Sequence, residues 1–396
     1  GLDEFARWLK LVDAELMLAV NLGTRGIQAA LDLLEYANHP SGTALSDQRI
    51  ANGTLAPHDV RMWCLGNEMD GPWQTGFMTA DDYGKLAART AAAMRMADSR
   101  LELVACGSSG SGMPTFGEWE RTVLEHTYDQ IDYVSCHAYY QERGGDLDSF
   151  LASALDMQYF IDTVVAAADH VGSKRHSRKR IKLSFDEWNI WYLDEHRTSG
   201  EVNEQWRFAP RQLEDVYSVA DAVVLGDLLM TLLRNADRVT AASLAQLVNV
   251  IAPIMTEPAG PAWRQTTFYP FAITSRLARG VALRVPVDVP TYPTAVHGEA
   301  PLVDAVATHD AEAGCAALFL VNRSRSDAIT VTADIRSLGD VAIRETQAIH
   351  DSDVYAKNTL DDPERVTPKT NDTVRIDAGE LTITLPPVSW TAVSLG

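Results

Sequence analysis

Paired cysteines, clustered basic residues and long apolar runs are all scarce in this chain of 396 residues. No uninterrupted apolar stretch reaches the roughly 18 residues that a membrane-spanning helix needs, so we expect no membrane partner. The net charge is −20 at pH 7. Nucleic acids and anionic membranes need clustered Lys and Arg, so this balance argues against both as partners. The one basic run, residues 174–180, is interpreted as a solvated loop.

Metal-ligand patterns are absent from the sequence as well. The ten histidines include no HxxxH or HxH pair, and no group of Cys and His has the spacing of a ligand set. We therefore expect no metal, and no other cofactor is expected because two carboxylates, described below, can carry the chemistry.

The four cysteines form no CxxC pair, and each lies within an apolar, strand-like segment. Buried free thiols fit this pattern better than disulfides do, which indicates a reducing compartment and predicts a cytoplasmic protein. The sequence begins with Gly1 rather than Met, so the question of a signal peptide stays open. The cysteines are Cys64, Cys106, Cys136 and Cys315.

Helix-like and strand-like segments alternate through the first 280 residues. Near-continuous apolar strands separated by helices are typical of a parallel sheet covered on both faces. We count six such strands, whereas a closed α/β barrel of the TIM type has eight. The predicted strands are residues 15–20, 60–65, 101–106, 133–136, 181–185 and 239–244.

The sequence pattern changes after about residue 280, where short runs of alternating apolar and polar residues are separated by Gly, Pro, Asp and Asn. Such runs are typical of an antiparallel β-sandwich. We place the boundary within residues 280–293, which gives a barrel-type domain over 1–280 and a jelly-roll-like sandwich over 281–396.

Polar side chains follow several of the predicted strands at their carboxyl ends. Glu68 follows the second strand, His137 and Tyr139 the fourth, Glu187 the fifth and Gln246 the sixth. The carboxyl ends of barrel strands meet at one face, so we expect these residues to share a pocket. Two glutamates in one pocket indicate a retaining glycosidase, with a protonated acid beside the leaving oxygen and a carboxylate below the anomeric carbon. The alternative is that both are ordinary solvated acids at strand ends.

These residues resemble those of a known enzyme family. Gly66-Asn67-Glu68 and Asp186-Glu187-Trp188-Asn189 are similar to the acid and nucleophile stretches of clan members with these groups on barrel strands four and seven. The stretches QLVNVIAP (246–253) and LPPVSW (385–390) narrow the resemblance to glycoside hydrolase family 51, the α-L-arabinofuranosidases. AVNLGT (19–24), HAYY (137–140) and TFYP (267–270) agree with it. The similarity covers the whole chain.

The resemblance implies two catalytic roles and one substrate contact. Glu68 would be the general acid and then the base, and Glu187 the nucleophile that forms an arabinosyl ester. Asn67 would hydrogen-bond the 2-hydroxyl of the sugar. The substrates would be arabinose-containing oligosaccharides of the arabinan or arabinoxylan type, cut from the non-reducing end.

Four more residues match the family at its sugar subsite. Tyr139 would orient the nucleophile, Gln246 would contact the furanose and Trp191 would line the subsite. His137 would lie near the nucleophile, although a core histidine fits the pattern equally well. The family also implies a homo-oligomer, often a hexamer.

The match to the family begins at its third barrel strand, so the six strands counted would be strands three to eight. A sheet with two unpaired edges does not close with the usual tilt and shear. We therefore expect this polypeptide by itself to be neither a stable nor an active enzyme.

Three other functions fit parts of the pattern. A β-xylosidase or endoglucanase of the same clan would use the same glutamates, although residues 246–253 argue against it. A non-catalytic carbohydrate-binding relative would bind sugar without turnover. A metal-dependent hydrolase is disfavoured by the missing ligand spacing.

Overall fold

The computed structural model describes residues 1–198, 208 and 210–396, which form two compact units. Unit 1 consists of Gly1–Ala138, Phe160–Glu187 and Arg238–Ala242. Unit 2 consists of Tyr139–Tyr159, Trp188–Asp237 and Ser243–Gly396. Three strands of the first sheet run from one unit into the other, so neither unit is a single stretch of sequence.

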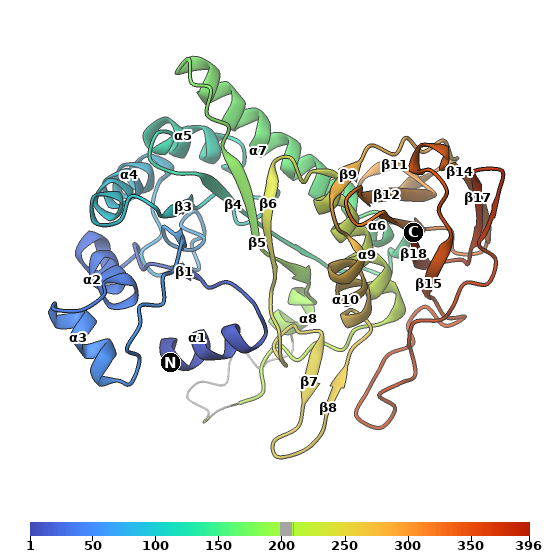
Figure 1. The fold of residues 1–396 in the computed structure, drawn as a ribbon, viewed down its shortest axis with the longest axis horizontal. Helices are drawn as coiled ribbons and strands as arrows, with labels where there is room; N and C mark the ends of the chain where they lie inside the picture. The colour runs from blue at the N-terminus through green and yellow to red at the C-terminus, as the bar shows by residue number, and fades with distance from the viewer. Residues whose placement is uncertain (199–207, 209) are drawn as a thin grey trace. The chain divides into compact units, whose positions relative to one another are not determined.

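The first sheet has six strands in the order β1-β2-β3-β4-β5-β6 (Figure 1). β1 pairs with β2, β2 with β3, and β3 with β4, all in parallel. Sequence order and spatial order agree, as expected when each strand is followed by a covering helix. The strands are β1 (Met17–Ala19), β2 (Met62–Cys64), β3 (Glu102–Ala105), β4 (Tyr133–Tyr140), β5 (Lys182–Ile190) and β6 (Val239–Leu244).

Helices connect the strands of this sheet. Figure 1 shows α2, α4 and α5 one after another along the outside of β1–β3. α4 illustrates why they form: its sequence is rich in Ala, and the side chain of Thr79 caps its first turn by accepting from the Asp82 amide. The helices up to β5 are α1 (Leu2–Leu11), α2 (Gly26–Asn38), α3 (Ala44–Ala51), α4 (Ala80–Ala97), α5 (Glu118–Thr127), α6 (Leu147–Leu151) and α7 (Ala154–Lys174).

The later helices and a short hairpin lie in unit 2. α9 is almost wholly buried and begins with a capping box, in which Ser218 and Asp221 each bond the other's backbone amide. These elements are α8 (Leu193–Thr198), α9 (Val219–Arg234), β7 (Ile254–Thr256), β8 (Ala262–Arg264) and α10 (Phe268–Leu277).

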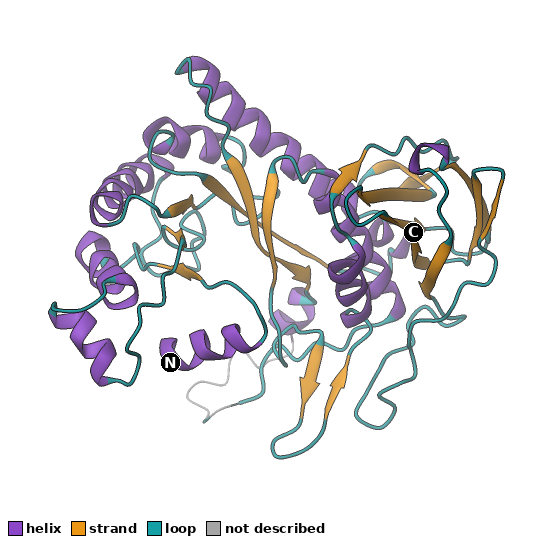
Figure 2. Ribbon diagram, in the orientation of Figure 1, coloured by secondary structure: helices purple, strands orange, loops and turns teal. Residues whose placement is uncertain are grey.

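Two antiparallel sheets form a sandwich in the last third of the chain (Figure 2). One has the order β15-β18-β13-β12-β9 and the other β14-β17-β16. Apolar side chains from both sheets, such as Leu318 and Ile383, fill one core. The elements are β9 (Val281–Leu283), β10 (Thr291–Thr294), β11 (Gly298–Pro301), β12 (Val303–Asp310), β13 (Cys315–Asn322), β14 (Ile329–Asp334), the 3-10 helix Arg336–Leu338, β15 (Ile343–Ile349), β16 (Arg375–Asp377), β17 (Glu380–Leu385) and β18 (Ser389–Leu395).

The predicted fold class, a barrel-type α/β sheet followed by an all-β sandwich, is confirmed, and so is the count of six strands. The predicted ends of two strands are wrong: β4 continues to Tyr140 and β5 to Ile190. The two units do not follow the boundary at residue 280, so the division into domains 1–280 and 281–396 stays a prediction. Among the residues described, every helix is too short or too polar to cross a membrane.

Candidate active site

The segment after β2 turns sharply and presents Glu68. Gly66 has φ +108° and Glu68 has φ +45°, both in the left-handed region. Glycine enters that region freely, whereas a residue with a long side chain is strained there. Such strain persists where surrounding contacts hold it, and it clusters at functional sites. The backbone therefore fixes the direction in which the Glu68 side chain leaves the chain.

Three side chains contact the carboxylate of Glu68. Trp73 Nε1 donates to Oε2 over 2.5 Å, and Gln74 Nε2 donates to the same oxygen over 3.3 Å. The other oxygen, Oε1, lies 3.0 Å from Nδ1 of His137. Burial raises the pKa of Glu68, but these contacts outweigh burial and leave its pKa below the ordinary value. Glu68 is therefore ionised in the resting site near neutral pH.

Gly71 packs against the ring of Trp73. A Cβ at position 71 would lie 2.5 Å from Cε2 of that indole, closer than atoms can approach. The glycine thus leaves room for the indole at the position from which its N–H reaches Glu68.

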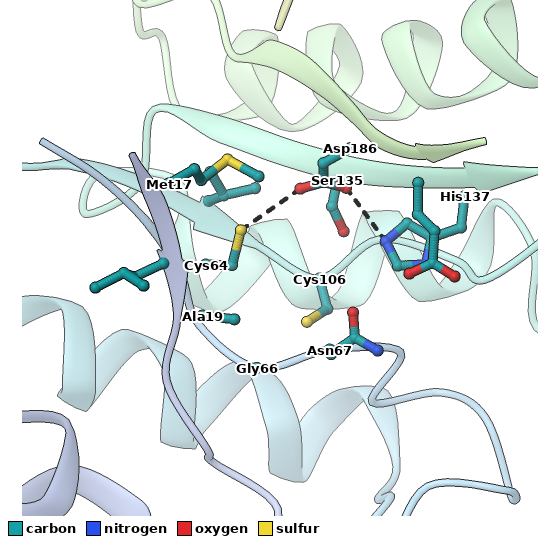
Figure 3. A pocket seen from close by; sticks show the side chains of 12 residues that line it. Met17, Ala19, Cys64, Gly66, Asn67, Cys106, Ser135, His137 and Asp186 are labelled. Carbon is teal, nitrogen blue, oxygen red and sulfur yellow. Dashed lines mark hydrogen bonds and ion pairs between the residues drawn. The ribbon is translucent and has the colours of Figure 1, made fainter. Parts of the chain in front are cut away.

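His137 lies on β4 with both ring nitrogens facing acids. Nδ1 lies 3.0 Å from Oε1 of Glu68 and 3.5 Å from Oε2 of Glu187. On the other side of the ring, Nε2 lies 3.2 Å from Oδ1 of Asp186 (Figure 3). Burial lowers the pKa of His137, but the bonds to Asp186 and Glu68 and the charge of Glu187 outweigh burial and raise it to about 10. His137 is therefore an imidazolium near neutral pH.

Asp186 is itself held in place. Its side chain is 6% exposed. Its second oxygen, Oδ2, accepts from Oγ of Ser184 over 3.2 Å and from Sγ of Cys64 over 3.5 Å. Asp186 therefore links β2 and β5 to the imidazolium on β4.

The two candidate catalytic carboxylates lie close together. An oxygen of Glu68, an oxygen of Glu187 and a ring nitrogen of His137 all lie within 4.8 Å of one another. Retaining glycosidases separate their carboxyl groups by about 5–5.5 Å, and inverting enzymes by about 6.5–9.5 Å, which leaves room for a water. The spacing here is closer to the first arrangement.

His137 and Glu187 line a pocket in unit 1, beside the segment that carries Glu68 (Figure 3). Its polar lining consists of the exposed Asn67, together with Ser135, His137, Asp186 and Glu187. Its lining comes from β1 to β5 and from the segments that follow β2 and β3. The lining residues are Met17, Leu18, Ala19, Cys64, Gly66, Asn67, Val104, Cys106, Ser135, His137, Asp186 and Glu187.

The glycine-rich segment after β3 supports the Glu68 segment. Asp70 Oδ2 accepts from the backbone amide of Ser109 over 3.0 Å and from its hydroxyl over 3.1 Å. The backbone amide of Ser108 in turn donates to the buried carboxylate of Glu120. The bonds of Asp70 to Ser109 thereby join the segment after β2 to the segment after β3.

Within the described part of the chain, Glu68, His137 and Glu187 form a group that could share a cation, because one atom from each lies within 4.8 Å of the others. A histidine ligates metal through a bare ring nitrogen. Here both nitrogens of His137 face acids and its pKa is raised to about 10, so both nitrogens carry protons. The donor set therefore suits proton transfer better than metal binding.

The remaining three predicted site residues belong to unit 2. The rings of Tyr139 and Trp191 meet edge to face with centroids 4.8 Å apart. Gln246 is exposed, and its backbone amide donates to the carbonyl of Ile251 over 3.1 Å. Asn189 supports the same loop by donating to the carbonyls of Ala245 and Ile251. The roles predicted for these residues stay predictions.

Glu68, Asn67, His137 and Glu187 are thus brought together within unit 1. His137 and Tyr139 lie within β4, and Glu187 within β5, which corrects the expectation that they follow the strands.

Three further residues that contact the site were missed by sequence reasoning. Asp186 was visible beside Glu187 as part of the same motif, whereas Trp73 and Gln74 gave no signal in the sequence. Their importance comes only from the turn that brings them back to Glu68.

Two family models match the chain. Residues 1–177 match the model described as alpha-L-arabinofuranosidase 1 domain, and residues 186–389 match the alpha-L-arabinofuranosidase C-terminal domain.

Curated relatives agree with these models. An intracellular exo-alpha-(1->5)-L-arabinofuranosidase of Streptomyces lividans is 57% identical, over 99% of this chain and 59% of its own length. An exo-alpha-(1->6)-L-arabinofuranosidase of Bifidobacterium longum is 54% identical, over 99% of this chain and 77% of its own length. The chain thus spans about three fifths of the first relative.

Solved structures with the same fold include AbfB, a family 51 alpha-L-arabinofuranosidase from Bifidobacterium longum. It is 50% identical, with a TM-score of 0.95, over 100% of this chain and 79% of that structure. An alpha-L-arabinofuranosidase from Thermotoga maritima, solved with arabinose, is 27% identical with a TM-score of 0.85, over 100% of this chain and 78% of that structure.

Proposed function

Because the chain belongs to the family 51 α-L-arabinofuranosidases, we propose that it contributes the catalytic centre of a retaining exo-α-L-arabinofuranosidase. The enzyme releases terminal α-L-arabinofuranosyl residues from the non-reducing ends of arabinan-type or arabinoxylan-type oligosaccharides. The observation that carries the proposal is the carboxylate pair, with oxygens of Glu68 and Glu187 within 4.8 Å of each other. That spacing supports double displacement at one anomeric carbon.

Each carboxylate has one role in each half of the reaction. Glu187 attacks the anomeric carbon and forms an arabinosyl ester, while Glu68 protonates the departing oxygen. In the second half, Glu68 removes a proton from water, which attacks the anomeric carbon and releases Glu187 with retained configuration. Residues 1–280 would form the catalytic domain, and residues 281–396 an accessory sandwich.

Four other side chains would bind the sugar. The amide of Asn67 would bond the 2-hydroxyl as positive charge develops on the ring, a role that the family resemblance implies and that its exposed position in the pocket lining supports. The family match supports a sugar contact for Gln246, for Tyr139 and for its ring neighbour Trp191.

The relatives support some details of substrate and location. One is named for 1→5 linkages and the other for 1→6 linkages, so linkage preference varies among close relatives. Relatives named intracellular support a cytoplasmic enzyme. We also propose a homo-oligomer on the family resemblance.

The first test is the release of nitrophenol from 4-nitrophenyl α-L-arabinofuranoside by the purified protein. Turnover by the wild-type protein that is lost in Glu187→Ala, which lacks the nucleophile, would support the proposal. It would also contradict the expectation that this polypeptide by itself is inactive. Glu118→Ala, which removes an exposed carboxylate on α5, is the matched control and should retain activity. Equal activity in wild type and Glu187→Ala would contradict the proposal.

The same assay separates the other candidate functions. Preference for xylosides or glucosides would indicate another glycosidase of the clan. Sugar binding without turnover would indicate a carbohydrate-binding relative. Loss of activity on treatment with EDTA would indicate a metal-dependent hydrolase.

A further inference from the structure

His137 stands between the two carboxylates and is not used by the double displacement itself. The proposed mechanism requires a proton on Glu68 when the glycosidic oxygen departs. In the resting site, however, Glu68 is a carboxylate whose pKa lies below its ordinary value. The proton must therefore come from a neighbour at the moment of reaction.

Nδ1 of His137 lies 3.0 Å from Oε1 of Glu68 and is the ionisable donor among the three side-chain contacts described for that carboxylate. The other two contacts are an indole N–H and an amide N–H, which do not ionise near neutral pH. Only the imidazolium can give up its proton.

We propose that His137 stores the catalytic proton of Glu68 and that Asp186 is the positioning residue that makes Nδ1 the nitrogen which releases it. This inference rests on the proposed function, because it supplies the acid that double displacement needs.

The role of Asp186 follows from its position. Oδ1 lies 3.2 Å from Nε2, on the side of the ring away from Glu68. When the imidazolium loses one proton, Asp186 favours the tautomer that keeps the proton on Nε2. Nδ1 is then left with a bare lone pair, which faces Glu68 and can take the proton back.

The proton balance closes over one catalytic cycle. Once substrate is bound, the proton moves from Nδ1 of His137 to Oε1 of Glu68, and from there to the leaving oxygen as the bond to the anomeric carbon breaks. In the second half, Glu68 takes a proton from the attacking water and passes it to Nδ1. The site ends with His137 as an imidazolium and Glu68 as a carboxylate, as it began.

The groups around the imidazolium all favour a positive charge there. Glu68 reaches it from the segment after β2, and Asp186 and Glu187 reach it from β5. The two thiols in the same pocket add no charge near neutral pH. Burial raises the pKa of Cys64, and it raises the pKa of Cys106 to about 12. Together they agree with a pKa of about 10 for His137.

The first arm of the test uses wild-type protein with 15N-labelled histidine. The ring nitrogen shifts of His137, assigned with a His137→Gln sample, are followed by NMR as the pH rises. Both nitrogens are expected to be protonated at pH 7, and Nδ1 is expected to lose its proton first. Loss from Nε2 first, or a neutral ring at pH 7, would overturn the inference.

The second arm compares the pH profiles of kcat/KM for wild type, Asp186→Asn and Ser184→Ala on 4-nitrophenyl α-L-arabinofuranoside. Asp186→Asn removes the charge at nearly constant shape, so the alkaline limb is expected to fall by about one pH unit or more. Ser184→Ala removes a neutral partner of Asp186 and keeps the charge, so its alkaline limb should stay at the wild-type value.

The leaving group gives a third readout. Proton delivery matters most when the departing oxygen is a poor leaving group. Asp186→Asn is therefore expected to lose at least about tenfold more kcat on an arabinose disaccharide than on the nitrophenyl substrate. A purely structural defect would reduce both equally and leave the alkaline limb unmoved, which would overturn the inference.

Different experimental outcomes contradict the proton store and the proposed function. An active wild type whose alkaline limb does not move in Asp186→Asn contradicts the proton store and leaves the proposed function standing. A wild type that titrates as expected but hydrolyses no arabinofuranoside contradicts the proposed function, and the proton store with it.

Discussion

Trp73 donates a hydrogen bond of 2.5 Å to Glu68 although the residue is 56% exposed. An exposed side chain rarely holds so short a bond unless its position is fixed by packing. The close approach of Gly71 to the indole ring supplies that packing.

Trp73→Phe should raise the pKa of Glu68. The indole N–H favours the carboxylate form, so its loss makes the proton harder to remove. The alkaline limb of kcat/KM reports loss of the proton shared by Glu68 and His137, and it is expected to move up by as much as about one pH unit. Phe77→Leu changes an exposed aromatic residue in the same segment and is the control. A limb that moves down, or not at all, would contradict this account.

Gly71→Ala should impair catalysis while leaving the fold intact. The new Cβ would lie 2.5 Å from the indole of Trp73, which must move away from Glu68. Misplacing a catalytic group by about 1 Å can cost about a hundredfold, so we expect kcat to fall at least about tenfold with little change in the melting temperature. Gly110→Ala is the matched control, since a Cβ there has no neighbour within 4 Å. Equal kcat values for the two variants would rule out this role.

Arg323→Met should destabilise unit 2. Nη2 of Arg323 lies 2.6 Å from Oδ2 of Asp227, and both side chains are 0% exposed. Removing the cation leaves a buried acid without its partner, which typically costs about 3–5 kcal/mol. Denaturant unfolding measures the lost free energy of unfolding. The double variant Arg323→Met with Asp227→Leu should recover much of that stability. If Arg323→Met alone were as stable as wild type, the ion pair would contribute little.

Cys315 should be the one cysteine that reacts readily in the folded protein. Cys64, Cys106 and Cys136 are buried, and burial raises the pKa of each of these thiols. Cys315 is only partly buried. An aromatic disulfide reagent at pH 7.5 is expected to modify about one thiol per native chain and none in Cys315→Ser. Rapid modification of a second thiol would mean that the pocket opens.

Sequence reasoning located the strands of the first sheet because each is a short apolar run. It ended β4 and β5 too early, since the polar residues His137 and Asp186 interrupt the apolar pattern. Those side chains are buried nonetheless, and they face each other as an ion pair within the pocket. Pairing of this kind between strands leaves no trace in the local pattern.

The closeness of Glu68 and Glu187 was predictable, because both lie near the carboxyl ends of strands of one sheet, β2 and β5. The partners of these acids were harder to find. The contact of Trp73 with Glu68 depends on a turn whose geometry only the structure gives. Away from this site, the bond between Arg323 and Asp227 joins residues 96 positions apart and was missed as well. Contacts formed by folding, rather than by neighbouring sequence, account for what was missed.

The arrangement of acids around His137 has a consequence for ligands other than substrate. Three carboxyl groups surround one imidazolium, so the pocket carries an excess of negative charge. A cyclic amine of furanose size, protonated on its ring nitrogen, would meet the same field that stabilises an oxocarbenium-like transition state. Under the proposed function, the pocket is expected to bind such a cation more tightly than a neutral sugar of equal size.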